Sequence, residues 1–449
     1  MRYISDFHVH GKYSRACSKE LTIDNLEKYA RIKGVDILGT GDFSHPGWRA
    51  HIAEKLEEDS TGSRDGILRT KTGFPFVLST EYSFIYSQGG KGRRVHHVVL
   101  APSLDVADQI TETMKRHGRV DYDGRPIFGI SSIEFTEEVM AIDKDIEIIP
   151  AHIWTPWFGA LGSNSGFDSI KECFGDQVRH IHAIETGLSS DPPMNWRLSQ
   201  LDRFQIVSFS DLHSYWPWRI GREATVFDIA EDQLGYKKII EAIRTGNGLA
   251  ETIEVDPSYG KYHFDGHRKC GVVMGPSESR RHNNICPVCR KPLTVGVLQR
   301  VEELADRPEG YMPKDRPGFR SLIPLHDIIS IIIGKGVATK ATWQEYNRLL
   351  KLGKSENDVM LNISRDELLK STDPQIADAI MLNREGRIKV RPGYDGVYGE
   401  PILMPQSGHA TRTTDGRHEA GLGQQDAEPK KHEVQRPLKR VQTGLSDFI

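Results

Sequence analysis

Short apolar runs alternate with amphipathic stretches along residues 1–250. The runs have the length of buried strands, and they begin at Tyr3, Val35, Phe76, Val95, Ile146, Ile181 and Ile206. The stretches between them have helical spacing, as in residues 22–33, which start at the N-cap residue Thr22 and stop before Gly34. This alternation predicts an α/β domain with a mostly parallel sheet, either open or closed into a barrel. Its active site would lie at the carboxyl ends of the strands.

The pattern changes after this domain and predicts several further segments. Residues 255–300 are rich in aromatic residues, Gly and Cys and lack a clear period, as expected of a small metal-binding module. Residues 301–403 carry helical patterns and predict a helical C-terminal domain, in which Asp373 is the N-cap of one helix. The polar residues 404–441 contain no apolar repeat and predict a disordered linker, after which residues 442–449 become apolar again.

Composition narrows the class of protein. The 449 residues include 59 Lys and Arg and 62 Asp and Glu, so the net charge of −3 requires any nucleic-acid-binding surface to be local. The longest apolar run, residues 328–333, is too short to cross a membrane, and the N-terminus does not look like a signal peptide. We therefore expect a cytoplasmic protein that does not bind membranes. In a reducing compartment, clustered Cys residues favour metal binding over disulfides.

Possible metal ligands accompany successive apolar runs. His8 and His10 are two residues apart, so both project from one face of the first strand. The later runs bring nitrogen and carboxylate donors at Asp42, His45, Glu81, His96, His97, His152, Glu185, Asp211 and His213. This mixture of donors suits Zn²⁺, Mn²⁺ or Fe, and a bridging carboxylate such as Glu81 suits two adjacent ions. Adjacent divalent ions can generate hydroxide and bind a phosphate, which predicts phosphoester hydrolysis.

The order of these residues resembles the PHP (polymerase and histidinol phosphatase) domain over residues 1–250. The resemblance implies a distorted (β/α)7 barrel with a multinuclear metal site. The ligands that it implies are His8, His10, Glu81, His96, His152, Asp211 and His213, and the catalytic residues among them are Glu81, Asp211 and His213. The resemblance prefers His96 to His97 because the family's His stands four residues before the position of Leu100. Only one of the two can serve, because neighbouring strand residues point to opposite faces.

The chain departs from the PHP pattern at two places. Phe43 stands where the family has a His, so Asp42 and His45 are the candidate replacements. Arg15 and Ala16 stand where many members carry a further ligand. The number of ions, two or three, therefore stays open, as does the choice among Zn²⁺, Mg²⁺ and Mn²⁺.

Residues 255–300 also contain the spacing of a structural zinc site. The knuckle formed by Cys286 and Cys289 supplies two thiolates, and His267 with Cys270 supplies the other pair. His263 is the alternative histidine ligand. The surrounding basic residues are Arg268, Lys269, Arg280, Arg281, His282, Arg290 and Lys291. They favour contacts with phosphate, or form only a solvated surface.

The C-terminal residues resemble a PCNA-interacting peptide. Gln442, Leu445, Phe448 and Ile449 have its spacing, and a single turn would place the apolar side chains on one face. The resemblance implies binding to the PCNA sliding clamp, with the polar linker as a tether that gives reach.

The chain as a whole resembles the endonuclease Q family, from residues 7–14 through the zinc motif to residues 393–396. The resemblance implies a metal-dependent endodeoxyribonuclease for DNA repair in an archaeal-type cell. It would cut double-stranded DNA on the 5′ side of uracil, hypoxanthine, xanthine or an abasic site, with the lesion flipped into a pocket beside the zinc module.

Two other functions compete with this interpretation. One is a small-molecule phosphatase of the histidinol-phosphatase type, and the other is a non-catalytic DNA-repair adaptor with a decayed metal site. Tryptophans near the later motifs either stack against bases or pack within the protein: Trp154, Trp157, Trp196, Trp216 and Trp218.

Overall fold

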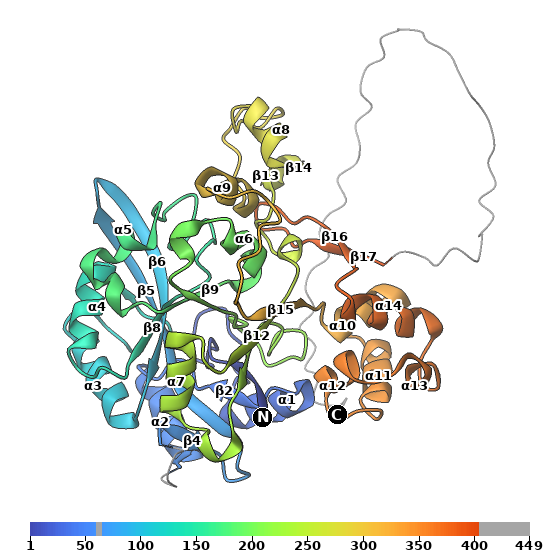
Figure 1. Ribbon diagram of the computed structural model, residues 1–449, viewed down its shortest axis with the longest axis horizontal. Helices are drawn as coiled ribbons and strands as arrows, with labels where there is room; N and C mark the ends of the chain where they lie inside the picture. The colour runs from blue at the N-terminus through green and yellow to red at the C-terminus, as the bar shows by residue number, and fades with distance from the viewer. Residues whose placement is uncertain (60–64, 404–449) are drawn as a thin grey trace. The chain divides into compact units, whose positions relative to one another are not determined.

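The structure is a computed structural model, and it describes residues 1–59 and 65–403 (Figure 1). Residues 1–403 form one compact unit. The predicted linker at 404–441 and the predicted PCNA-interacting peptide at 442–449 lie outside the described residues. Among the helices of the described part, none is long and apolar enough to span a lipid bilayer.

The first part of the chain forms a distorted barrel. Its wall follows β1 (Arg2–Asp6), β2 (Ile37–Gly39), β5 (Pro75–Gln88), β6 (Lys91–Ala101), β8 (Glu147–Pro150), β9 (Ala183–Glu185) and β10 (Gln205–Val207). Local contacts bridge the gaps in this wall. Ile153 N donates a hydrogen bond to Glu185 O at 3.1 Å, and Val9 forms a parallel bridge with Leu212. The predicted α/β fold is confirmed, and each predicted strand has a counterpart.

The sheet is mixed, so the prediction of mostly parallel strands was wrong. β5 and β6 form a long antiparallel hairpin, and β6 pairs antiparallel with β8. The hairpin forms because Gly89 and Gly90, with φ of 62° and 74°, allow a tight turn where a helical crossover was expected. β11 (Ala224–Asp228) pairs antiparallel with β1, and β12 (Leu249–Glu254) pairs antiparallel with β11. The remaining strands of this sheet are β3 (Glu57–Glu58), β4 (Ile67–Arg69), β7 (Ile127–Phe128) and β15 (Gly318–Ser321).

Apolar side chains fill one end of the barrel and leave the other end polar. Phe7, Val77 and Val98 belong to a buried cluster that also includes five apolar side chains of α7: Tyr236, Ile239, Ile240, Ala242 and Ile243. Glu81 continues the row of Val77 along β5, and His96 continues that of Val98 along β6, because alternate residues share a face. The barrel helices are α1 (Ile23–Lys33), α2 (Pro46–Lys55), α3 (Leu104–Lys115), α4 (Ser132–Met140), α5 (Ile170–Phe174), α6 (Pro192–Trp196) and α7 (Tyr236–Thr245).

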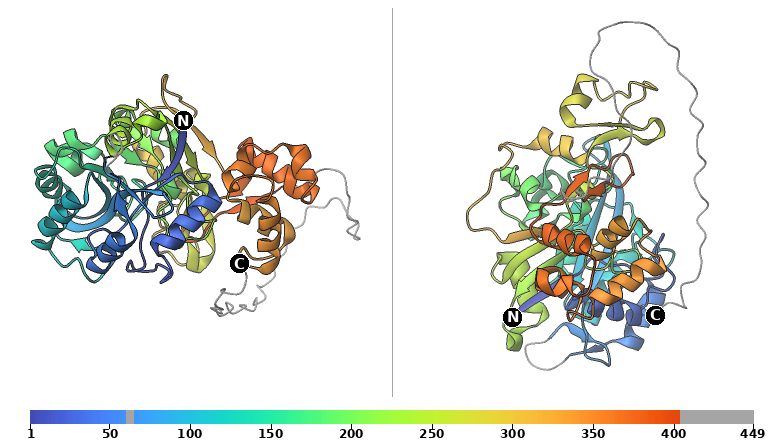
Figure 2. Two further views of the ribbon diagram at one scale, coloured as in Figure 1. Left: turned by 90° about the horizontal axis from the view of Figure 1, so that it is seen from below. Right: turned by 90° about the vertical axis from the view of Figure 1, so that its right-hand side faces the viewer.

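Two smaller segments follow the barrel (Figure 2). The first contains β13 (Asp265–His267), β14 (Val272–Met274), α8 (Pro276–Arg281) and α9 (Val297–Leu304). The second contains α10 (Leu325–Ile333), α11 (Lys340–Leu349), α12 (Glu356–Leu361), α13 (Arg365–Leu369), α14 (Pro374–Arg384), β16 (Lys389–Arg391) and β17 (Glu400–Ile402). A buried ion pair of 2.6 Å between Lys33 and Glu356 joins α1 to α12. The domain boundaries given by the sequence stay predictions.

Candidate metal centre

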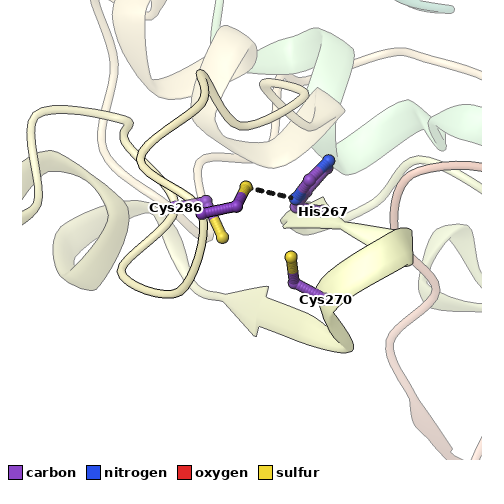
Figure 3. Close-up of side chains that lie close together, drawn as sticks. His267, Cys270 and Cys286 are labelled. Carbon is purple, nitrogen blue, oxygen red and sulfur yellow. Dashed lines mark hydrogen bonds between the residues drawn. The ribbon is translucent and has the colours of Figure 1, made fainter.

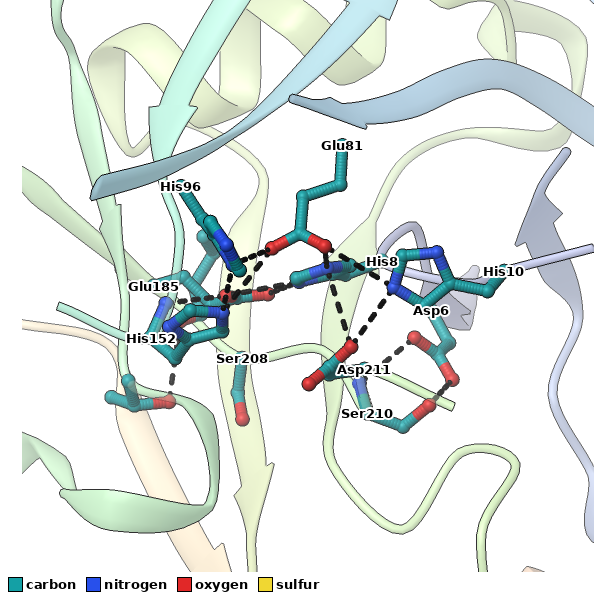
Figure 4. A network of polar contacts seen from close by, with 12 residues as sticks. Asp6, His8, His10, Glu81, His96, His152, Glu185, Ser208, Ser210 and Asp211 are labelled. Carbon is teal, nitrogen blue, oxygen red and sulfur yellow. Dashed lines mark hydrogen bonds and ion pairs between the residues drawn. The ribbon is translucent and has the colours of Figure 1, made fainter. Parts of the chain in front are cut away.

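The polar end of the barrel gathers two clusters of potential metal ligands around Glu81 (Figure 4). The first cluster consists of His8, His10, Glu81 and Asp211, and the second of Glu81, His96 and His152. Within each cluster the ligand atoms lie within 4.8 Å of one another. Both clusters use donors that divalent metal ions accept.

The two carboxylate oxygens of Glu81 face different clusters. Oε2 is 3.2 Å from His10 Nε2, and Oε1 is 2.6 Å from His96 Nδ1 and 3.2 Å from His152 Nε2. This placement is the one required of a carboxylate that bridges two adjacent ions. It agrees with the role expected for Glu81, although Glu81 lies in the middle of the long strand β5 and not at a strand end.

The surroundings of His8 test whether the site suits a cation. His8 Nδ1 donates a hydrogen bond to Glu185 at 2.9 Å, whereas its buried Nε2 has no hydrogen-bond partner among the described residues. This nitrogen lies 3.4 Å from Glu81 Oε2 and 3.5 Å from Asp211 Oδ1. A histidine that donates one ring N–H to a carboxylate and points the other nitrogen at further ligands is typical of metal sites. Burial opposes protonation, but the charges of Glu185, Glu81 and Asp211 raise the pKa of His8 well above its usual value. The local potential therefore favours a bound cation, and the residues fit divalent metal ions.

Carboxylates behind the clusters orient the histidines. Asp42 accepts a hydrogen bond from His10 Nδ1 at 3.0 Å and others from Gly11 N and Ser14 Oγ, each at 2.7 Å. Asp42 thus lies outside both clusters and positions His10. Glu185, whose place at the end of β9 was visible in the sequence, does the same for His8.

Three further histidines have distinct positions. The ring of His213 lies 4.7 Å from that of His10, and its Nδ1 is 3.6 Å from Asp211 Oδ1, so it borders the first cluster. The ring of His45 stacks on Tyr13 at 4.3 Å and belongs to neither cluster. His97 points away from the site and hydrogen-bonds to Ser132 at 2.8 Å.

Sequence reasoning missed one charged residue of the site. Arg125 Nη1 donates to Glu81 Oε2 at 3.0 Å. It comes from the loop between α3 and β7, far from any ligand motif, so its spacing gave no signal.

Strained backbone accompanies the ligands. His152, Asp211 and Asp42 have positive φ values of 30°, 46° and 45°, which residues other than glycine rarely adopt. Gly187 approaches His152 so closely that a Cβ on Gly187 would lie 2.5 Å from the Cβ of His152. The site is therefore built on backbone that only the surrounding fold maintains.

The expected zinc ligands meet at a separate place (Figure 3). Ligand atoms of His267, Cys270, Cys286 and Cys289 lie within 4.8 Å of one another, whereas His263 is not part of this group. Burial opposes ionisation of Cys286, but the backbone N–H groups of Cys289 and Val288 help to lower its pKa to about 6. The thiolate, which is the form that binds metal, is thereby favoured at neutral pH.

Comparison with known proteins places the chain in a family. The structure matches a lesion-specific endonuclease Q of Pyrococcus furiosus with a TM-score of 0.79 and 30% sequence identity. The match covers 90% of this chain and 96% of that chain. The chain belongs to the endonuclease Q family. A second endonuclease Q structure, bound to a 27-mer duplex with an abasic lesion at its active site, matches with a TM-score of 0.80, 30% identity and coverages of 90% and 97%.

Two sequence comparisons complement this result. Residues 324–387, which include helices α10 to α14, match the family model of the MJ0043 C-terminal domain. The uncharacterized protein MJ0043 of Methanocaldococcus jannaschii is 36% identical over 258 residues, which make up 56% of this chain and 32% of that protein. The chain thus spans about a third of the length of this relative. The expectation of an enzyme of the endonuclease Q family is confirmed.

Proposed function

We propose that the protein hydrolyses double-stranded DNA on the 5′ side of deaminated bases and abasic sites. The observation that carries the proposal is the pair of clusters sharing Glu81, next to a cavity of about 430 Å³ lined by His152, Asp211 and His213. A related endonuclease Q holds an abasic lesion at its active site. A metal centre beside a cavity provides one place for the scissile phosphate and another for the lesion.

The roles of the residues follow from their positions. His8, His10, Glu81, His96, His152 and Asp211 would hold the ions. Divalent ions, once bound, would supply an activated water and neutralise charge on the phosphate. Arg125 balances part of the negative charge of Glu81. Burial lowers the pKa of His213 despite its neighbour Asp211, so the neutral imidazole is available at the edge of the cavity to accept a proton.

The proposal includes a structural zinc ion and a clamp-binding tail. His267, Cys270, Cys286 and Cys289 provide the donor set of a Cys₃His site. Gln442, Leu445, Phe448 and Ile449 would bind the PCNA sliding clamp, which keeps the enzyme close to replicated DNA. Uracil, hypoxanthine, xanthine and the abasic site are the proposed lesions.

One assay separates this function from its rivals. The protein is incubated with duplexes that carry one uracil or one abasic site, and with histidinol phosphate, each with Mg²⁺ or Mn²⁺. We expect a metal-dependent nick at the lesion and no release of inorganic phosphate. Release of phosphate without a nick would favour the small-molecule phosphatase, and binding to the lesion without any hydrolysis would favour the adaptor.

A further inference from the structure

A buried carboxylate at the end of β1 contacts the backbone that carries Asp211 (Figure 4). The side chain of Asp6 is fully buried, and Asp6 belongs to neither ligand cluster. Its Oδ1 accepts a hydrogen bond from Ser210 N at 3.0 Å. Its Oδ2 accepts one from Ser210 Oγ at 2.5 Å and another from Gly221 N at 3.0 Å. One side chain of β1 thus holds the residue before Asp211 and a second residue further along the chain.

These contacts fix both ends of a loop. Residues 210–221 lie between β10 and β11, and they include the cluster residue Asp211 and its neighbour His213. Asp211 has a φ of 46°, a conformation that residues other than glycine keep only where the surrounding structure imposes it. Asp6 provides such a constraint, because it joins the two ends of the loop through Ser210 and Gly221.

The contacts of Asp6 require a carboxylate. Burial penalises a negative charge, so a carboxylate is a costly residue for a buried strand end unless hydrogen bonds satisfy it. Two backbone N–H groups and one hydroxyl converge on Asp6, and an ionised carboxylate offers only acceptors to them. An asparagine would turn an amide N–H toward at least one of these donors. The side chain therefore matches the loop that it holds.

We propose that Asp6 is a positioning residue that fixes Asp211 in the first cluster and thereby sets the affinity of this cluster for a divalent ion. The inference rests on the proposed function, because it concerns the metal centre that would cut the DNA. Asp211 Oδ1 lies 3.1 Å from His10 Nε2 and 3.5 Å from His8 Nε2, so a shift of its backbone changes the spacing of the donors. Groups that orient metal ligands typically contribute about 10- to 100-fold to metal affinity.

The test measures the binding of Mn²⁺ alone, by calorimetry, in protein that keeps the zinc it holds as purified. Asp6→Asn replaces one acceptor oxygen with a donor and should weaken the binding of one Mn²⁺ ion by about 10- to 100-fold. Ser210→Ala is milder because it removes only the Oγ contact, and it should weaken binding by at least about threefold.

The matched control is Asp36→Asn. Asp36 accepts a hydrogen bond from Ile4 N of β1 at 2.9 Å, but it belongs to neither cluster. This variant should bind Mn²⁺ like the unmodified protein. Urea unfolding shows whether each variant is folded, and Ser210→Ala decides the question if Asp6→Asn does not fold.

A double-mutant cycle separates positioning from a general effect on the fold. If Asp6 acts through Asp211, Asp6→Asn should change the Mn²⁺ affinity by less than about twofold in a protein that already carries Asp211→Asn. Additive losses would overturn the inference, as would an unchanged affinity in both Asp6→Asn and Ser210→Ala. If the unmodified protein bound Mn²⁺ but left a lesion duplex intact, the proposed function would fail, whereas the binding data would still decide the role of Asp6.

Discussion

At the scale of single residues, the geometry of the metal site depends on the direction in which each candidate ligand side chain points. Glu81 presents one oxygen to His10 and the other to His96 and His152. Strand alternation predicted that only one of the neighbours His96 and His97 could face the site, and the structure places the two on opposite sides of β6. The supporting groups Arg125 and Glu185 come from other elements, and their contacts depend on the folded chain.

Gly187 provides a residue-scale prediction. Gly187→Ala would place a Cβ 2.5 Å from the Cβ of His152, at a backbone φ of 58° that disfavours side chains. Displacement of His152 should lower the rate of nicking by about 100-fold, since small shifts of reacting groups are costly. The control is Gly129→Ala, where a Cβ meets nothing within 4 Å. Equal rates for the two variants, measured on a lesion duplex, would show that His152 tolerates the shift.

At the scale of elements, helices α10 and α11 support the loop that follows His213. Trp216 and Trp218 of this loop stack at 5.5 Å. Trp218 contacts His326 of α10 and Trp343 of α11, at 4.8 Å and 6.0 Å between ring centroids. These two tryptophans thus pack within the protein, whereas Trp157 is 37% exposed.

His326 makes this packing sensitive to acid. Burial, with a smaller effect of Lys33, holds the pKa of His326 well below its usual value. The unfolded chain binds a proton below about pH 6.5 and the folded chain does not, so stability falls as the pH falls. Between pH 7.5 and 5.5, His326 should account for a loss of about 1.4 kcal/mol in the free energy of unfolding. In His326→Phe, the loss in the free energy of unfolding between these two pH values should be smaller by that amount, as measured by urea unfolding. An identical pH dependence of stability in the variant and the unmodified protein would refute the assignment.

The zinc module gives a second element-scale prediction. Cys289→Ser removes one of the four donors and should reduce the zinc content by about one ion per chain. The control is Cys173→Ala, since Cys173 is buried far along the chain from the zinc motif and should leave the zinc content intact. Zinc is measured by mass spectrometry of the purified proteins. Unchanged zinc in Cys289→Ser would show that these residues do not hold it.

At the scale of the whole molecule, local sequence signals predicted the helix caps and the ligand motifs. Contacts between distant segments could not be predicted in this way. The caps Thr22 and Asp373 accept the expected backbone hydrogen bonds, and the ligand motifs meet in the expected order. In contrast, β15 joins the sheet from a segment expected to be helical. The cavity combines residues 219, 261 and 398, and no periodicity or spacing relates segments that far apart.

Deleting residues 442–449 tests whether clamp binding and DNA cleavage depend on different parts of the chain. The loss of Leu445 and Phe448 should abolish binding to the sliding clamp, measured by calorimetry, because the apolar anchors are gone. Nicking of a short lesion duplex without the clamp should stay within about twofold, since none of the proposed active-site residues is removed. Loss of nicking on the short duplex would show instead that the tail contributes to catalysis.

The most direct test of the account maps the cut on a duplex with a single abasic site or uracil. We predict a nick on the 5′ side of the lesion that leaves 3′-hydroxyl and 5′-phosphate ends, stops with a chelator and returns with Mg²⁺ or Mn²⁺. Asp211→Asn, which removes the negative charge of one cluster residue, should lower the rate by at least about 100-fold. Asp105→Asn on α3 should cut like the unmodified enzyme. Cutting that persists in the chelator, or in Asp211→Asn at the full rate, would contradict the account.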